Sequence, residues 1–165
     1  MESAGTAEVD ARYRYVLGRR WGAGPTVLWV LANPSSADGE RDDPTVRRCV
    51  SFARGHGAGG LLLVNLRAWR DADPGRLADV ADPVGPGNDA AIGSALAATS
   101  GPVVVAWGVQ RDAARVRTVL DLLGERPILC LGVTRDGHPR HPLYVAGTTR
   151  LRPWSVPVPP AVDRR

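Results

Sequence analysis

Four apolar runs of the chain each end abruptly at a polar residue or a glycine. They read TVLWVLANPSSAD, GLLLVNLRAW, VVVAWG and ILCLGVTRDGHPRHPLY. Continuous apolar runs are typical of strands buried on both faces, as in parallel sheets. The pattern therefore predicts four parallel strands. Their carboxyl ends carry Asn33, Asn65, Trp107 with Gly108, and the segment 132–141.

Helical periodicity between these runs predicts crossover helices. In DDPTVRRCVSFARGHG, Asp43 is placed to cap a helix and Pro44 suits its first position. The alanine-rich segment 88–99 and the apolar stripe of RDAARVRTVLDLL, which ends at Gly124, predict two more. Parallel neighbours need such crossovers, which are nearly always right-handed.

The segment from Arg12 to Trp21 alternates instead of running apolar, which predicts a half-solvated antiparallel edge strand. We therefore expect an α/β fold, a three-layer sandwich. It has a central four-stranded parallel sheet, helices on both faces and this N-terminal antiparallel edge strand. Residues 12–155 form a single α/β domain in this interpretation. Residues 1–11 are expected to be a disordered N-terminal tail, and residues 156–165 a flexible proline-rich C-terminal tail.

Composition is that of an ordinary globular domain. The 165 residues suffice for one core, with 44% hydrophobic and 23% charged residues. No apolar run approaches the roughly 20 residues of a membrane span, and the N-terminus lacks a signal peptide's apolar centre. We therefore expect a cytoplasmic monomer without membrane contact. Cys49 and Cys130 fall on apolar positions, which indicates core residues rather than a disulfide.

Every one of the 21 basic residues is an arginine, against 17 acidic residues, giving a net charge of +4. A GC-rich genome explains this bias, and selection for phosphate binding is the alternative. Four arginines beside the predicted strand ends are candidate phosphate ligands: Arg47, Arg48, Arg67 and Arg140. A nucleic acid such as DNA, or a nucleotide, is thus a permitted partner.

The carboxyl ends of parallel strands are where open α/β sheets bind ligands. Asn33 either forms an Asx turn before Pro34 or orients a water or an amide-like ligand edge, beside Ser35. Asn65 ends an apolar run, and burying its amide unpaired would cost ~1–3 kcal/mol. We expect it to cap a turn or contact a ligand. Trp107 ends the third strand and joins this group of candidate ligand contacts.

His138 and His141 lie in a loop stiffened by prolines, which suits a fixed imidazole. No Cys or Glu accompanies them, so we expect no metal, and the absence of phosphate-loop and dinucleotide motifs leaves no cofactor to expect. Asp38 and Asp42 follow the first strand and are candidate water activators, with a solvated surface position as the alternative for at least one.

Several motifs together resemble a bacterial family of unknown function. They are LANPS (31–35), DDPTVRRC (42–49), DPVGPGND (82–89), the pair Trp107-Gly108 and DGHPRHPLY (136–144). More distantly, their order resembles that of the uracil-DNA glycosylase superfamily. That superfamily has an Asp-Pro or Asn-Pro after the first strand, an Asn ending a Leu-rich strand and a late His-Pro loop.

This resemblance implies a parallel central sheet with helices on both faces, and a role for each motif. Asn33 would hold an attacking water, Asn65 would read the base edge, His141 or His138 would stabilise the departing base, and Leu143 would wedge into the vacated stack. Trp69 is available to stack a base. Since an amide cannot take the water's proton, Asp38 or Asp42 would have to contribute.

The sequence therefore predicts an N-glycosidase, similar to DNA glycosylases, that cleaves a nucleobase from its sugar with a positioned water. Two alternatives stay open. One is a non-catalytic protein that binds nucleic acid or a nucleotide, and the other is a hydrolase of a different small molecule.

Overall fold

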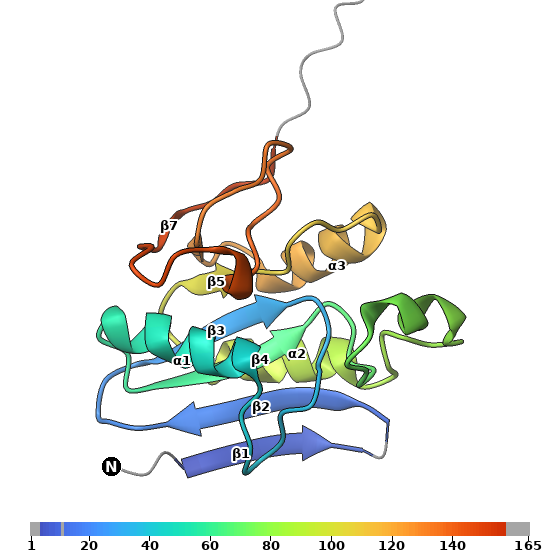
Figure 1. The fold of residues 1–165 in the computed structure, drawn as a ribbon, viewed down its shortest axis with the longest axis horizontal. Coiled ribbons are helices and arrows are strands. Elements are labelled where there is room, and N and C mark those ends of the chain that lie inside the picture. The colour runs from blue at the N-terminus through green and yellow to red at the C-terminus, as the bar shows by residue number, and fades with distance from the viewer. Residues whose placement is uncertain (1–3, 11, 158–165) are drawn as a thin grey trace, which may run out of the picture.

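The structure is a computed structural model that describes residues 4–10 and 12–157. Within these residues, seven strands form one sheet in the order β1-β2-β4-β3-β5-β6-β7 (Figure 1). The strands are β1 (Ala4–Val9), β2 (Arg14–Arg20), β3 (Thr26–Leu31), β4 (Gly60–Asn65), β5 (Val103–Val105), β6 (Ile128–Cys130) and β7 (Arg152–Pro153).

Three α-helices and two 3-10 helices connect the strands in the described part of the chain. They are α1 (Pro44–Gly55), η1 (Pro74–Asp79), α2 (Asn88–Ala97), α3 (Ala113–Leu123) and η2 (Pro142–Tyr144). The predicted cap of α1 is confirmed, because Oδ1 of Asp43 accepts the Val46 N–H at 2.9 Å. The N-cap of α2 is Gly87, which makes no side-chain capping bond, and the helix begins at Asn88. Nδ2 of Asn88 donates to the Asn65 carbonyl at 3.0 Å.

The α/β class is confirmed, but the predicted extent of the sheet is wrong. The sheet has seven strands and is mixed. The pairs β3–β4, β3–β5 and β5–β6 are parallel, and the pairs β1–β2, β2–β4 and β6–β7 are antiparallel. The segment 12–21 contains β2, which is antiparallel as predicted but lies inside the sheet between β1 and β4. The two outer strands, AGTAEV and RP, lack apolar runs, so the hydrophobic pattern carried no signal for them.

The expected N-terminal tail is also wrong for residues 4–9. Ala4–Val9 form β1, which pairs along its length with β2. Gly5 allows the loop after β3 to lie against this strand, since a Cβ at Gly5 would be 2.2 Å from the Gly39 carbonyl oxygen. Residues 1–3, 11 and 158–165, which include most of the predicted C-terminal tail, lie outside the described residues. No helix in the described ranges has the length and apolarity to cross a membrane.

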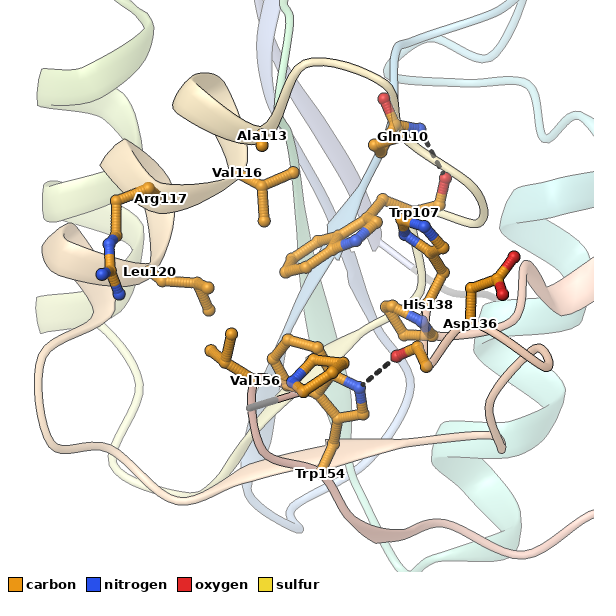
Figure 2. A pocket seen from close by; sticks show the side chains of 13 residues that line it. Trp107, Gln110, Ala113, Val116, Arg117, Leu120, Asp136, His138, Trp154 and Val156 are labelled. Carbon is orange, nitrogen blue, oxygen red and sulfur yellow. Dashed lines mark hydrogen bonds between the residues drawn. The ribbon is translucent and has the colours of Figure 1, made fainter. Parts of the chain in front are cut away.

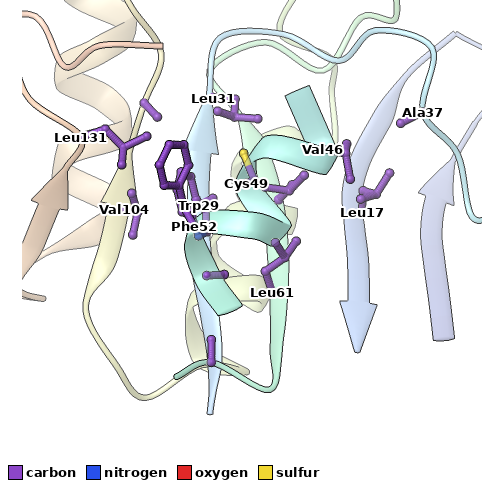
Figure 3. Close-up of a cluster of buried hydrophobic side chains, with 14 residues drawn as sticks. Leu17, Trp29, Leu31, Ala37, Val46, Cys49, Phe52, Leu61, Val104 and Leu131 are labelled. Atoms are coloured by element: carbon purple, nitrogen blue, oxygen red, sulfur yellow. The ribbon is translucent and has the colours of Figure 1, made fainter. Parts of the chain in front are cut away.

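Helices cover both faces of the sheet, and the side chains of β3 alternate between the two layers. Trp29 faces α1, where its ring stacks on Phe52 at a centroid distance of 6.4 Å (Figure 3). Leu28 faces α2 and α3 on the other side. Each fully buried aliphatic or aromatic side chain of this kind stabilises the fold by about 1.5–3 kcal/mol. Cys49 and Cys130 are buried, one in each layer, and both are free thiols, as predicted.

Chain direction singles out one end of the sheet. From β3 the chain passes through α1 to β4 on one side, and from β5 it passes through α3 to β6 on the other side. The loops that leave the adjacent strands β3 and β5 therefore diverge. Such a divergence at carboxyl ends is where α/β sheets form ligand crevices.

Candidate functional site

A small polar cleft opens at the carboxyl end of β3. Its volume is about 30 Å³, room for about one or two water molecules. Its walls come from the start of β2, the end of β3 with its loop, the first turn of α1 and the loop before η2. The lining residues are Arg14, Leu31, Asn33, Ser35, Asp43, Thr45, Val46 and His141.

Arg14 supplies a buried positive charge to this cleft. Only 2% of the residue is exposed, and Nη1 donates to the Ala37 carbonyl at 2.8 Å. Nε has no hydrogen-bond partner, and no carboxylate of residues 4–10 and 12–157 forms an ion pair with the guanidinium. Burial lowers the pKa of Arg14 to about 10, while the charge of Asp43 acts to raise it. The side chain is therefore cationic at neutral pH and incompletely compensated.

Asp43 brings a carboxylate to the same cleft. It is buried, and its two oxygens accept backbone N–H groups from Val46 (2.9 Å) and Ala37 (3.3 Å). An ionised carboxylate has about four acceptor positions, so Asp43 keeps acceptor capacity for a water in the cleft. The sequence predicted only its capping role.

Asn33 follows β3 and lines the cleft. Its Nδ2 donates to the carbonyls of Pro34 and Asp71, both at 3.2 Å. Among the described residues no N–H donates to Oδ1, so the Asx turn of the alternative interpretation does not form. The amide is thus held in one orientation, with its acceptor free to bind a water.

His141 reaches the cleft from the late loop. Its Nδ1 accepts the Leu143 N–H at 3.3 Å, which caps η2. Burial lowers the pKa of His141 below 6.5, although the charge of Asp43 opposes this shift. The ring is therefore neutral at pH 7. Because Nδ1 is an acceptor, we assign the proton to Nε2.

The late loop is fixed to the end of β5 by backbone contacts. The N–H of Gly108 donates to the Pro139 carbonyl at 2.9 Å. Gly108 has a φ of 71°, a left-handed conformation that glycine adopts without strain. A Cβ at this position would lie 3.6 Å from Cβ of His141. The glycine after Trp107 thus lets the chain turn where the histidine loop approaches.

Asn65 is buried beside the cleft without lining it. It is 1% exposed, and neither of its amide atoms has a partner among the described residues. It pairs in register with Leu31, which lines the cleft, and in-register neighbours of parallel strands present side chains to the same face. The Asn65 amide is thus buried without a hydrogen-bond partner among the described residues, next to a polar cleft. The sequence analysis noted that such burial costs free energy.

The structure separates the two candidate histidines. His138 lines a larger pocket with Trp107, and that pocket shares no lining residue with the cleft. Trp69 lies in neither. Its ring packs edge-on against Tyr13 at 5.4 Å, below the guanidinium of Arg12.

The two predicted water activators lie outside the cleft. Asp42 forms an ion pair with Arg19 at 2.7 Å. Oδ1 of Asp38 accepts the N–H groups of Glu40 and Arg41, and these bonds lower the pKa of the Asp38 carboxyl. Both carboxylates therefore organise the loop after β3.

Each candidate phosphate ligand is engaged by the protein itself. Arg47 donates to the Asp42 carbonyl, and Arg140 donates to the Val133 carbonyl, although both side chains are largely exposed. Arg67 is paired with Asp112 at 2.9 Å. None of these three lines the cleft.

Arg48 connects α1 to the histidine loop. Its guanidinium donates to the carbonyls of Pro142 and Val145 and stacks over Phe52 at 4.8 Å. It therefore holds η2, which follows His141, against α1.

Of the remaining predicted ligand contacts, one lines the cleft and two do not. Ser35 lines the cleft, whereas Pro34 is buried behind it and offers its carbonyl to Asn33. Leu143 is 43% exposed just past His141. It lies at the surface and does not line the cleft.

The fold and this site define an α/β protein with a polar cleft at the carboxyl edge of a mixed sheet. A family model described as "Protein of unknown function (DUF1643)" matches residues 14–143, and the chain belongs to that family. The matched range begins at Arg14 and contains every residue that lines the cleft. No curated protein and no solved structure matches the chain.

Proposed function

We propose that the cleft hydrolyses an N-glycosidic bond between a nucleobase and its sugar, in a nucleic acid such as DNA or in a nucleotide. One observation carries this proposal. Asn33 and His141, which lie far apart in the sequence, face one cleft that also holds the buried charges of Arg14 and Asp43. The resemblance of the motif order to the uracil-DNA glycosylase superfamily supports the same chemistry.

The reaction needs three contributions. A water oxygen bonds to the anomeric carbon, the C–N bond breaks, and its electron pair leaves with the base. The sugar passes through a state with oxocarbenium character, so negative charge develops on the base. The enzyme must orient the water, accept its proton and stabilise the base.

The cleft residues match these tasks. Oδ1 of Asn33 orients the water, and the carboxylate of Asp43 takes its proton. The cation of Arg14 and the Nε2–H of neutral His141 stabilise the departing base. In this scheme Asp43 is the proton acceptor, because the amide of Asn33 cannot take a proton from the water. The sequence analysis gave this role to Asp38 or Asp42.

The size of the cleft limits where a nucleobase could lie in this scheme. A space of about 30 Å³ admits water but not an organic ring. In this scheme the nucleobase sits over the mouth, and Leu143, which is exposed two residues past His141, contacts it. Contact between the base and Asn65 requires the cleft to open, because Asn65 is 1% exposed and does not line the cleft.

The proposal is tested by measuring release of free base. Single-stranded and duplex oligonucleotides carrying uracil, hypoxanthine or alkylated bases, and the corresponding nucleosides and nucleotides, are incubated with the protein, and released base is quantified by chromatography. Absence of release from every substrate by the folded protein would refute the proposal. Binding without release would favour the non-catalytic alternative.

Matched variants separate chemistry from folding. Asp43→Asn keeps a good helix cap but removes the proton acceptor. His141→Asn keeps an acceptor for the Leu143 N–H but removes the Nε2 donor. Each should lower base release by about 10²–10⁴-fold. Asp112→Asn makes the same change at the N-cap of α3, outside the cleft, and it should leave the rate unaltered.

A further inference from the structure

A second and larger pocket lies on the opposite side of the sheet from α1. Its volume is about 300 Å³, and it is bounded by α3, the loop 136–139 and the chain around Trp154 (Figure 2). Pockets of this size, at the small end of those that hold organic ligands, are lined mainly by apolar and aromatic groups with a few polar ones. The cleft contributes nothing to it.

The pocket has one aromatic wall and one aliphatic wall. The indoles of Trp107 and Trp154 meet edge to face, with centroids 5.7 Å apart and an interplanar angle of 87°. Val116 and Leu120 of α3 form the facing wall (Figure 2). Two perpendicular indoles offer a planar ring both an offset stacking contact and an edge contact.

Hydrogen bonds hold the aromatic wall in place. The indole N–H of Trp154 donates to the Gly137 carbonyl at 3.1 Å, and Nε2 of Gln110 donates to the Trp107 carbonyl at 2.8 Å (Figure 2). The wall is thus arranged before any ligand arrives, which lowers the entropy lost on binding.

Four of the lining residues are polar: Gln110, Arg117, Asp136 and His138. Asp136 and Arg117 carry opposite charges, and His138 offers a donor and an acceptor. With one positive and one negative side chain, the lining has no net formal charge, which favours an uncharged ligand over an anion. A purely aliphatic ligand would leave the polar lining groups without partners.

We propose that this pocket binds an uncharged planar aromatic heterocycle of one or two rings. The ring lies between the indoles and the α3 wall and directs its nitrogen-bearing edge toward His138 and Asp136. This site is separate from the chemistry proposed for the cleft, and it exists whether or not the cleft cleaves N-glycosidic bonds.

Binding is measured directly on the full chain, without any activity assay. Adenine, hypoxanthine and uracil serve as probes and cyclohexanol as the aliphatic control, followed by the NMR signals of the indole N–H groups and by equilibrium dialysis. At least one heterocycle should bind with a dissociation constant of about 1 mM or tighter and shift the signals of Trp107 and Trp154. The aliphatic control should bind at least tenfold more weakly.

Two variants locate the site. Val116→Phe fills the pocket from the α3 side, and Trp154→Leu removes one indole; each should weaken binding at least tenfold, with thermal melts confirming that the variants fold. His141→Asn, which changes a residue that lines the cleft and not this pocket, should bind the probe as the unmodified chain does. The proposal is overturned if no heterocycle binds, if folded pocket variants bind normally, if His141→Asn abolishes binding, or if cyclohexanol binds equally well.

Discussion

Replacing Arg14 with methionine tests whether the buried guanidinium serves the cleft or the fold. The substitution removes the hydrogen bond from Nη1 to the Ala37 carbonyl, which costs about 1.5–3 kcal/mol for a charged donor. It also removes a buried Nε that has no hydrogen-bond partner in the described part of the chain, a group whose desolvation costs about 1–3 kcal/mol. Methionine adds flexible apolar contacts in the same space. The two effects nearly cancel.

We therefore expect the free energy of unfolding to change by no more than about 2 kcal/mol in either direction, or about 8 °C in melting temperature for a chain of this length. Base release should fall by at least about 100-fold, as when one preorganised electrostatic group is lost. Urea unfolding followed by circular dichroism gives the first quantity, and chromatography of released base gives the second.

Arg19 provides the matched control on the same strand. It is also buried, but its Nε pairs with Asp42 at 2.7 Å and its Nη2 donates to the Asp38 carbonyl. Arg19→Met therefore breaks a satisfied network and should cost several kcal/mol. If Arg14→Met loses as much stability as Arg19→Met while base release persists, Arg14 is a structural residue and the reasoning fails.

Three further outcomes follow from contacts already described. Arg48→Gln should loosen the histidine loop and reduce base release about tenfold without changing the probe affinity of the larger pocket; equal rates would show that the loop needs no such tie. Since burial lowers the pKa of His141 below 6.5, the unfolded chain is protonated first as the pH falls. The fold therefore loses stability from about pH 6.5 down to the native pKa, and the difference in melting temperature between pH 7.5 and 5.5 should shrink in His141→Asn. Burial also raises the pKa of the Cys49 thiol, so thiol reagents should label Cys49 only under denaturing conditions, and rapid labelling of the native protein would contradict the packing.

The sequence predicted those elements whose signals are local. The start of α1 at Pro44 and the end of α3 before Gly124 follow from capping chemistry, and both are confirmed. β1 was missed because it is stabilised by pairing with β2, and the residues of β1 alone do not indicate that pairing.

Arg14 was missed because alternation along β2 is interrupted. Tyr13 forms a β-bridge with Trp69, whereas Leu17 pairs with Leu63. The pairing register of this segment with β4 and the residues after it therefore shifts between Tyr13 and Leu17. Arg14 and Leu17 consequently both contact the α1 side, although they are three positions apart. Regular alternation would have sent Arg14 to the opposite face.

The late loop that carries His138 and His141 could also be predicted only in part from the sequence. The sequence placed His138 and His141 near the strand ends but could not divide them between sites. That division depends on backbone bonds such as the one from the Gly108 N–H to the Pro139 carbonyl, which set the direction of each imidazole.

The strand order also affects how the chain folds as it is synthesised. β2 pairs with β1 and β4, and β4 begins about 40 residues after β2 ends, an interval of about 2–8 s at ordinary rates of translation. During that interval β1 and β2 can form only a two-stranded hairpin, which is marginally stable alone. One edge of β2 stays unpaired throughout, and so does the apolar strand β3, whose partners β4 and β5 are synthesised later. A chaperone acting on the nascent chain would therefore find its first exposed apolar strand at β3.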